Sequence, residues 1–310
     1  MTQIALCPLS THFLFGRCRI ISSVDTASVL FGFSKGLYSS WLFYKPDNLL
    51  IDCGEGCSTA LGNNGFGIER VLLTHGHIDH IAGLPVLLWA RAAGMGDNNK
   101  PLEVFYPRGD LYIADMMQFL ERTRAKLSFD LTWTPLDAGD SFSLTNQGTH
   151  ARRVETFRTQ HMPGRLTLGY KILETRRRLR IEYSKLADHE LRDLRLGGQE
   201  ISEEYQAIVA AFGGDGLPLN VEDVRGAELL VHEATILEAS ERKHQLHSTI
   251  GEALEVAAQV QPKAFVLQHF SGRYHTREIK AAAAKEIARL GIEFPVWCLF
   301  RDRLWQINWP

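Results

Sequence analysis

The chain has 310 residues, 45% of them hydrophobic, which is enough for a well-buried core. Its formal net charge is −2, so no global basic field indicates a nucleic-acid partner, although a local basic patch remains compatible with one. No apolar run approaches the roughly 18 residues of a membrane helix, and the amino terminus lacks a secretory signal, so we expect a cytoplasmic protein with no membrane partner.

The first half of the chain alternates short strands with helices. Strands over 41–44 and 49–52 flank Lys45-Pro46-Asp47-Asn48, which predicts a hairpin. An apolar strand follows over 70–74, and a helix is expected after it from the spacing of Ile81, Leu84, Leu87, Leu88 and Ala92. Glycine and asparagine at 94–99 end that helix. We expect a strand over 102–106 and an amphipathic helix over 113–126.

The second half continues the alternation. Strands are expected near 131–134, 141–144, 151–158 and 166–173, and the highly charged stretch 184–210 is predicted to be helical. Compact apolar strands follow over 229–231 and 264–267, with a helix over 249–260 between them. Together these elements predict one α/β domain over residues 1–310 with layered sheets.

A dense cluster of candidate metal ligands follows the strand over 70–74. Within Thr74-His75-Gly76-His77-Ile78-Asp79-His80, three imidazoles and one carboxylate lie within six positions. A loop after a strand end lets several of them converge, whereas one helix could not turn them all the same way. Imidazole and carboxylate together suit zinc and other first-row divalent metals. The cluster predicts a metal site rather than a run of solvated polar residues.

Further ligands must come from elsewhere, because a catalytic zinc site takes four or five donors and keeps one position open. Three later residues lie at the ends of predicted elements and are candidates: His161, Asp215 and His269. The remaining histidines considered lack such a setting and are interpreted as surface or structural residues: His150, His189, His244 and His275.

In this order, the residues resemble the metallo-β-lactamase superfamily, and within it the ribonuclease Z branch, whose members trim the 3′ end of precursor tRNA. The resemblance covers about 39–274. Its general motifs are Asp52-Cys53-Gly54-Glu55-Gly56, His75 through Pro85, His161 through Tyr170, and Gly213-Gly214-Asp215. Three motifs are specific to the branch: Val231-His232-Glu233-Ala234-Thr235, His247-Ser248-Thr249, and Gln268 through Tyr274. The resemblance implies a four-layer αβ/βα sandwich and a homodimer.

The resemblance also implies a centre of two divalent metal ions, with zinc expected and manganese as the alternative. His75, His77 and His161 would hold one ion, Asp79, His80 and His269 would hold the other, and Asp215 would bridge them. The motif around Asp52 would support these ligands from behind. A hydroxide bridging the metals would attack phosphorus, and Asp79 would accept its proton.

Two further residues are candidates for handling the leaving group. His247 would stabilise or protonate the leaving 3′-oxygen, and Glu233 would orient its imidazole through the other ring nitrogen. The structural alternative is a buried ion pair that only ties a strand to a helix.

The five cysteines form an odd and sparse set, which favours a reducing compartment over a disulfide framework. Cys53 and Cys57 flank the Asp52 motif, and we interpret them as buried thiols rather than as a separate metal site.

Three features differ from the family pattern. Gly216 follows the bridging aspartate where the family usually has threonine, and 29–38 replaces an amino-terminal glycine-rich loop. A charged arm or insertion is predicted around 174–206, without the glycine-proline tip of the family. It contains the run Arg176-Arg177-Arg178-Leu179-Arg180, and 171–195 hold eight Lys/Arg against five Asp/Glu. Such a run either binds phosphates or forms a solvated strand edge.

These features together predict a metal-dependent phosphodiesterase, with precursor tRNA as the leading substrate and RNA therefore as a partner. Cleavage of cyclic nucleotides or other small phosphodiesters is the main alternative. A thioester hydrolase or a dioxygenase would share the first motif but is not expected to carry the branch-specific ones. A non-catalytic scaffold is disfavoured by the complete ligand set.

Overall fold

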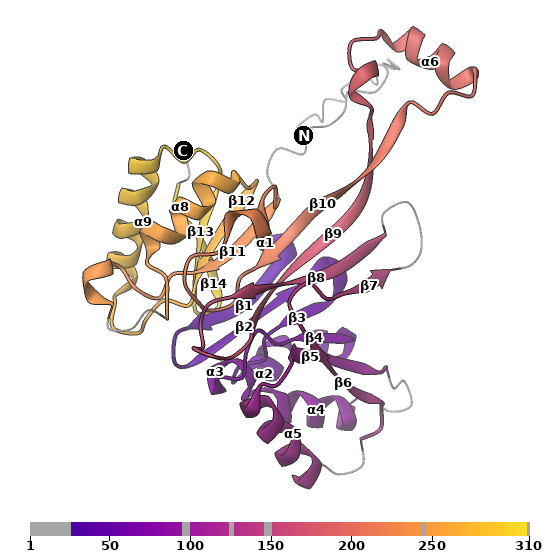
Figure 1. Ribbon diagram of the computed structural model, residues 1–310. Coiled ribbons are helices and arrows are strands. Elements are labelled where there is room, and N and C mark those ends of the chain that lie inside the picture. Colours follow the sequence, from indigo (N-terminus) through magenta and orange to yellow (C-terminus); the bar gives the residue numbers. More distant parts are fainter. Residues whose placement is uncertain (1–25, 95–99, 124–126, 146–150, 243–245, 309–310) are drawn as a thin grey trace, which may run out of the picture.

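The computed structural model describes residues 26–94, 100–123, 127–145, 151–242 and 246–308. Two of the five cysteines, Cys7 and Cys18, lie outside this part of the chain, as do His150 and His244. Two β-sheets lie face to face, and helices cover their outer faces (Figure 1).

The first sheet has six strands in chain order, namely β1 (Leu30–Lys35), β2 (Ser39–Tyr44), β3 (Leu49–Ile51), β4 (Arg70–Leu72), β5 (Leu102–Pro107) and β6 (Leu131–Leu136). Strands β1 to β3 pair antiparallel, and β3 to β6 pair parallel. The expected hairpin is confirmed, because β2 and β3 enclose a 3-10 turn at Lys45–Asp47 that ends with Asn48 in the left-handed conformation.

The second sheet has eight strands, which lie in the order β14-β13-β12-β11-β10-β9-β8-β7. Their bounds are β7 (Ser141–Thr145), β8 (Arg152–Thr159), β9 (Thr167–Leu179), β10 (Ser202–Phe212), β11 (Leu229–Glu233), β12 (Ala264–Gln268), β13 (Val296–Phe300) and β14 (Arg303–Gln306). Strands β10 to β13 pair parallel, and the outer pairs are antiparallel.

The described helices are α1 (Thr26–Val29), α2 (Cys57–Leu61), α3 (Ile78–Ile81), α4 (Leu84–Gly94), α5 (Leu111–Thr123), α6 (Asp188–Leu196), α7 (Val221–Val224), α8 (Ile250–Val260) and α9 (Thr276–Leu290). Short 3-10 turns also occur at Gly62–Gly67, Ile181–Tyr183 and Ala239–Glu241. Helices α2, α4 and α5 pack on the first sheet, and α7, α8 and α9 pack on the second. None of the helices in the described ranges combines the length and apolar composition that crossing a bilayer requires.

Burial of the central strands on both faces explains their continuous apolar sequences. In β3, Leu49 and Ile51 face the core between the two sheets, whereas Leu50 faces the helices on the other side. Strand β12 behaves in the same way, with Val266 turned inward and Phe265 turned toward α8 and α9. The predicted four-layer αβ/βα sandwich is therefore confirmed.

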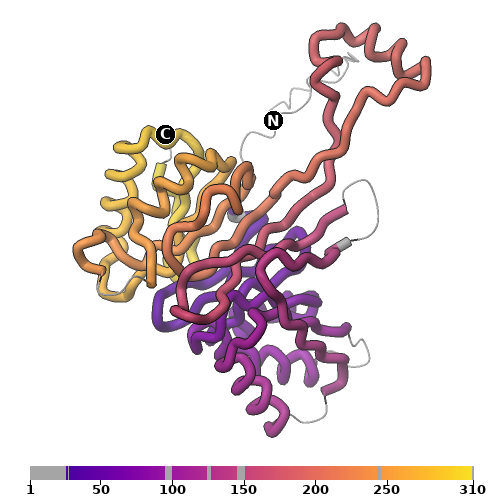
Figure 2. The backbone as a smooth tube through the Cα atoms, in the orientation of Figure 1, coloured from indigo at the N-terminus to yellow at the C-terminus, as the bar shows by residue number. Residues whose placement is uncertain are grey.

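The expectation of a helix over 184–210 is wrong for most of that stretch. Only Asp188–Leu196 forms a helix, α6, and Ser202–Phe212 form β10, which pairs antiparallel with β9. The outer halves of β9 and β10 lie in solvent, so neither needs an apolar face. The charged residues of β10 therefore lack the alternating apolar pattern from which a strand is predicted. These halves and α6 project from the body of the molecule (Figure 2). We call residues 174–206 the arm.

Ion pairs across the arm neutralise the arginine run. Arg178 lies opposite Glu203 in the strand register and pairs with it at 2.8 Å. Arg177 pairs with Glu200 at 2.8 Å, and Arg176 pairs with Glu228 at the base of the arm at 2.6 Å. Residues 174–206 contain seven Lys/Arg and eight Asp/Glu. Cross-strand pairing therefore accounts for the arginine run, as expected for a solvated strand edge.

A buried tyrosine joins the two sheets directly behind the histidine cluster. The hydroxyl of Tyr170 in β9 donates to the carbonyl of Leu73 at 2.6 Å, and the tyrosine is fully buried. Tyr170→Phe is expected to lower the free energy of unfolding by about 1–3 kcal/mol, because the carbonyl is left without a partner. Urea unfolding of this variant beside Tyr106→Phe, a half-buried tyrosine packed against Trp133, measures the difference. Equal losses in both variants would contradict this role.

Candidate metal centre

The candidate ligands come from the carboxyl ends of strands in both sheets. His75 lies three residues after the end of β4, His161 two after β8, Asp215 three after β10, and His269 directly after β12. His77 and the short helix α3, with Asp79 and His80, complete the loop after β4. Because parallel strands end at the same edge of a sheet, residues far apart in sequence meet there.

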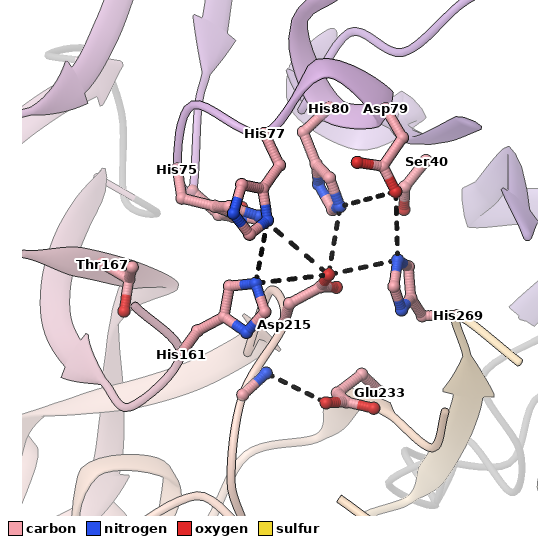
Figure 3. Close-up of polar contacts among 12 residues, drawn as sticks. Ser40, His75, His77, Asp79, His80, His161, Thr167, Asp215, Glu233 and His269 are labelled. Atoms are coloured by element: carbon pink, nitrogen blue, oxygen red, sulfur yellow. Dashed lines mark hydrogen bonds and ion pairs between the residues drawn. The ribbon is translucent and has the colours of Figure 1, made fainter. Parts of the chain in front are cut away.

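All seven candidate metal ligands lie within one cluster, with Asp215 at its centre (Figure 3). The ligand atoms of His75, His77 and His161 lie within 4.8 Å of one another, and so do those of Asp79, His80 and His269. Asp215 Oδ2 lies 3.2 Å from His80 Nε2 and 3.1 Å from His269 Nε2. It lies 4.0 Å from Nε2 of both His75 and His161. The structure thus brings together both predicted triads and their shared carboxylate.

Several buried polar atoms in this cluster have no hydrogen-bond partner among the described residues. They are His75 Nε2, His80 Nε2, His269 Nε2 and Asp215 Oδ1. Burying such atoms without a partner is costly. On the other side of the cluster, His161 Nε2 and His77 Nδ1 approach to 3.0 Å. Inward-facing nitrogens and carboxylate oxygens of this kind fit two divalent cations, one for each triad.

Hydrogen bonds on the outer side of three of these rings fix the direction of the inner nitrogen. His161 Nδ1 donates to the Leu246 carbonyl at 2.9 Å, and His80 Nδ1 donates to Asp52 at 2.8 Å. His269 Nδ1 lies 2.9 Å from the Thr235 hydroxyl. With Nδ1 carrying the proton, the Nε2 lone pair faces the cluster, which is the usual arrangement of a metal-binding histidine.

Asp52 supports the cluster from behind, in agreement with the expectation for its motif. Its carboxylate accepts hydrogen bonds from the Thr74 amide at 2.8 Å and from the Thr74 hydroxyl at 2.9 Å. The same hydroxyl lies 2.9 Å from His75 Nδ1. Asp52 therefore orients His80 directly and His75 through Thr74. Cys53 and Cys57, beside it, are buried free thiols as predicted.

Burial and charge shift the pKa values within the cluster in opposite directions. Burial lowers the pKa of His75 well below its usual value, and the nearby His80 adds to the effect. Burial also lowers the pKa of His77 and of His161. For Asp215, burial acts in the raising direction, but His269 and His80 outweigh it and hold the pKa well below its usual range. His75, His77 and His161 therefore present neutral imidazoles beside an ionised carboxylate. For His80, burial acts to lower the pKa, but Asp215 and Asp52 outweigh it and raise the value well above the usual one, so a cation bound at that ring would have to displace a proton.

Glu233 and His247 form a pair beside the cluster. Glu233 is 1% exposed, and one of its oxygens accepts from His247 Nδ1 at 2.9 Å and from the Ser248 amide at 3.0 Å. Burial acts to lower the pKa of His247, but Glu233 outweighs it and raises the value. The His247 side chain is 25% exposed, and its ring stacks on His269 at 5.6 Å between centroids. His247 is therefore the partly exposed member of the pair and lies next to the candidate ligand His269.

The departure at Gly216 has a structural reason in this chain. Its φ is +152°, and a Cβ built there would lie 2.8 Å from the Gln160 carbonyl oxygen. Its amide also donates to Glu233 at 3.0 Å. A threonine would be strained at this position, so glycine is required by the close approach of the loop before His161.

Asp110 and Leu37 form hydrogen bonds to the segment that carries the candidate ligands, but neither was predicted from the sequence. The Asp110 carboxylate accepts from the Gly76 amide at 2.9 Å and from the Tyr112 amide at the start of α5 at 2.9 Å. Its place just before a predicted helix is a helix-capping signal that points to it. The Leu37 amide donates to Asp79 at 3.2 Å, a backbone contact that carries no sequence signal. His189 and His275 lie exposed, away from the cluster.

Known proteins resemble this chain over most of its length. A family model described as Anti-Pycsar protein Apyc1 matches residues 32–196. The chloroplastic tRNase Z TRZ2 of Arabidopsis thaliana is 30% identical over 284 residues, covering 88% of this chain and 76% of that protein. Ribonuclease Z of Saccharolobus islandicus is 28% identical over 263 residues, covering 76% and 83%.

Solved structures share the fold at lower identity. Human tRNase Z, short form, superposes with a TM-score of 0.56 at 22% identity, covering 79% of this chain and 93% of that chain. The metallo-β-lactamase fold protein YhfI of Bacillus subtilis superposes with a TM-score of 0.58 at 15% identity, covering 89% and 99%.

Proposed function

The chain belongs to the ribonuclease Z-like branch of the metallo-β-lactamase superfamily and is a metal-dependent hydrolase, and from that premise we propose that it is an endoribonuclease that cleaves precursor tRNA at its 3′ side. The observation that carries the proposal is the pair of Glu233 and His247 beside the two ligand triads. Phosphodiester cleavage that releases an alkoxide benefits from a proton donor, which thioester hydrolysis does not need to the same degree. The curated relatives that match most of the chain are ribonuclease Z proteins.

In this proposal, His75, His77 and His161 would hold one cation and Asp79, His80 and His269 would hold the other, with the Asp215 carboxylate available to both. Zinc is the proposed metal, because imidazole and carboxylate donors suit it, and manganese is the alternative. Such ions, when bound, supply a nucleophile at neutral pH and neutralise charge on the phosphoryl oxygens.

The protein's own groups would then handle the protons. Asp79 Oδ2 lies 3.8 Å from His80 Nε2 and 3.5 Å from His269 Nε2, at the edge of the cluster, where it can accept a proton from the attacking water. His247 would donate a proton to the leaving 3′-oxygen. Glu233 is buried and hydrogen-bonded on both oxygens, so it holds the imidazole in place instead of reacting itself.

Hydrolysis of a cyclic nucleotide or another small phosphodiester is the second candidate. Two observations favour it: the match of residues 32–196 to the Apyc1 model, and the ion pairing of the arm arginines. Strand β10 has 11 residues and would span roughly 35 Å at about 3.3 Å per residue. The arm tip therefore lies far from the metal centre. Only a long substrate could contact the arm tip and the metal centre at once, and a small phosphodiester could not.

A competition between substrates tests the proposal. We expect the metal-loaded protein to cleave precursor tRNA with a kcat/KM at least about 10²-fold above that for 3′,5′-cyclic nucleotides, because binding energy from a large substrate is used at the reacting centre. Cleavage rates on precursor tRNA, cyclic nucleotides and bis(p-nitrophenyl) phosphate measure this. Activity on the small phosphodiesters without tRNA cleavage would rule out the tRNA-processing function and leave the second candidate.

We also propose that the protein is a homodimer. Exposed large hydrophobic residues gather on α3, α4 and α5: Ile78, Val86, Trp89, Leu111, Tyr112 and Phe119. Exposed apolar side chains in this number favour a protein partner. Light scattering on the purified chain is expected to give twice the 34.9 kDa of the monomer, and Trp89→Glu is expected to shift the mass toward one chain. A monomeric mass at micromolar concentration would contradict the proposal.

A further inference from the structure

A cavity of about 700 Å³ opens next to the metal centre. Its walls are the end of β1, the segment that follows β12, the start of α9 and the hairpin between β13 and β14. The segment 29–38, which replaces the family's glycine-rich loop, supplies Ser34 and Lys35 to this wall. The cavity is not part of either ligand triad.

Backbone contacts connect this cavity to the metal centre. Phe270, which lines the cavity, directly follows the candidate ligand His269. The His269 amide donates to the Ser34 hydroxyl at 2.9 Å, and the Gly36 amide donates to the Phe270 carbonyl at 3.1 Å. One residue further on, the Leu37 amide contacts Asp79. The segment from Ser34 to Leu37 therefore borders the cavity on one side and the candidate ligands Asp79 and His269 on the other.

Four cationic side chains line the cavity, against one carboxylate, that of Asp302. These cations are Lys35, Lys280, Arg301 and Arg303. Within the described ranges, none of the four lies within 4.0 Å of a carboxylate oxygen. The arginines of the arm, by contrast, are paired with glutamates. Cations that converge on a cavity without carboxylate partners indicate an anionic ligand.

Aromatic side chains line the same cavity. Trp305 is 53% exposed, and Lys280 Nζ lies 3.1 Å from the centre of its ring. Deeper in the cavity, the rings of Phe270 and Phe300 lie 5.4 Å apart. An inorganic anion needs no aromatic surface, but a nucleobase stacks on one, and single-stranded nucleic acid is bound by this combination of cations and aromatic rings.

We propose that this cavity binds a single-stranded stretch of the RNA substrate next to the scissile phosphate. Lys35, Lys280, Arg301 and Arg303 would contact its phosphates, and Trp305 would stack on a base. The inference rests on the proposed endoribonuclease function and assigns it a binding site that the metal ligands do not supply. It also gives the protein a local basic site for nucleic acid despite its net charge of −2.

Binding of a fluorescein-labelled RNA of six nucleotides tests the proposal. The RNA carries one non-hydrolysable methylphosphonate linkage at its centre, and the metal-loaded protein is titrated by fluorescence anisotropy at several salt concentrations. Arg301→Ala and Lys280→Ala are each expected to weaken binding and to reduce the slope of log Kd against log salt by about 0.7 for each lost phosphate contact. Trp305→Ala is expected to weaken binding by about 5- to 100-fold without changing that slope, and Trp305→Phe to restore most of the loss.

Two matched controls separate the cavity from general surface effects. Arg289→Ala removes the same charge from the far end of α9, where the arginine is paired with Glu255 and Glu286. Tyr205→Ala removes an aromatic ring from the arm, where Arg178 lies 5.1 Å from the ring centre. Neither control should change RNA affinity by as much as the cavity variants. Equal losses in a control and its matched cavity variant would overturn the proposal.

Further outcomes separate this inference from the proposed function. If arginine and lysine variants weaken binding but Trp305→Ala does not, the cavity takes an anion only and base stacking is wrong. If the wild type cleaves precursor tRNA while all cavity variants bind the RNA normally, the inference fails and the function stands. If the wild type neither binds the RNA nor cleaves precursor tRNA, the proposed function itself fails.

Discussion

Asp215→Ala is expected to abolish stoichiometric metal binding and to lower phosphodiester hydrolysis by at least about 10³-fold. Asp215 is the carboxylate that lies between the two ligand triads, with Oδ2 between 3.1 and 4.0 Å from four imidazole nitrogens. Its loss leaves those imidazoles without their shared anion. Metal per chain by mass spectrometry and turnover of bis(p-nitrophenyl) phosphate measure both effects.

Two companion variants sharpen this experiment. Asp215→Asn keeps the shape of the side chain but removes its charge, and we expect it to lose metal as well, because the buried site needs an anion to balance two cations. Asp193→Ala, on the exposed surface of α6, is the matched control and should keep full metal content. Two metals per chain in Asp215→Ala would contradict the bridging role.

His247→Ala is expected to keep both metals and to lose about 10²- to 10⁴-fold in kcat on RNA, the range typical of a general acid. His247 is in neither predicted triad, but its ring nitrogen lies within 4.8 Å of the ligand atoms of Asp215 and His269. Its side chain is 25% exposed, so the space left by its removal is open to solvent. The loss should appear in kcat rather than in KM, because the proton is needed only as the leaving oxygen departs.

The leaving group distinguishes this role from a structural one. A p-nitrophenyl ester releases a stable phenolate that needs no proton, so His247→Ala should affect its hydrolysis far less than that of RNA. Glu233→Gln should reproduce part of the loss, because the amide no longer holds the imidazole as a carboxylate does. Equal losses on both substrates would show that the pair only ties β11 to the segment before α8.

Sequence patterns predicted the elements that are buried and regular. The strands leading into the histidine cluster and into His269 were predicted because their apolar residues form short unbroken runs, as strands buried on both faces require. The sequence predicted a helix where β10 lies. The outer half of this strand is in solvent, and the positions of its charged residues match their partners on β9 and not a buried face. The spacing of apolar residues reflects which positions are buried, so it cannot identify a strand that is not buried.

The supporting contacts of the site could be predicted only in part. Asp52, Glu233 and His247 were identified through family motifs, and the structure places each beside the cluster. The contact of the Leu37 amide with Asp79 joins residues 42 positions apart through the backbone. Any residue except proline offers that amide, so no side-chain pattern can reveal it.

The sequence by itself determined which residues supply the chemistry. The density of imidazoles after one strand, together with the ordered motifs that end in His269, indicates a metal-dependent hydrolase from the chain alone. Only the tertiary structure decided how those groups combine. It showed that Asp215 lies between two triads and that the arm arginines are paired with glutamates. It also showed that cations without a carboxylate partner among the described residues meet Trp305 in a cavity beside the metal centre. The physical reason is that ligand type is a local property of the chain, whereas convergence and charge pairing depend on contacts between segments that only folding brings together.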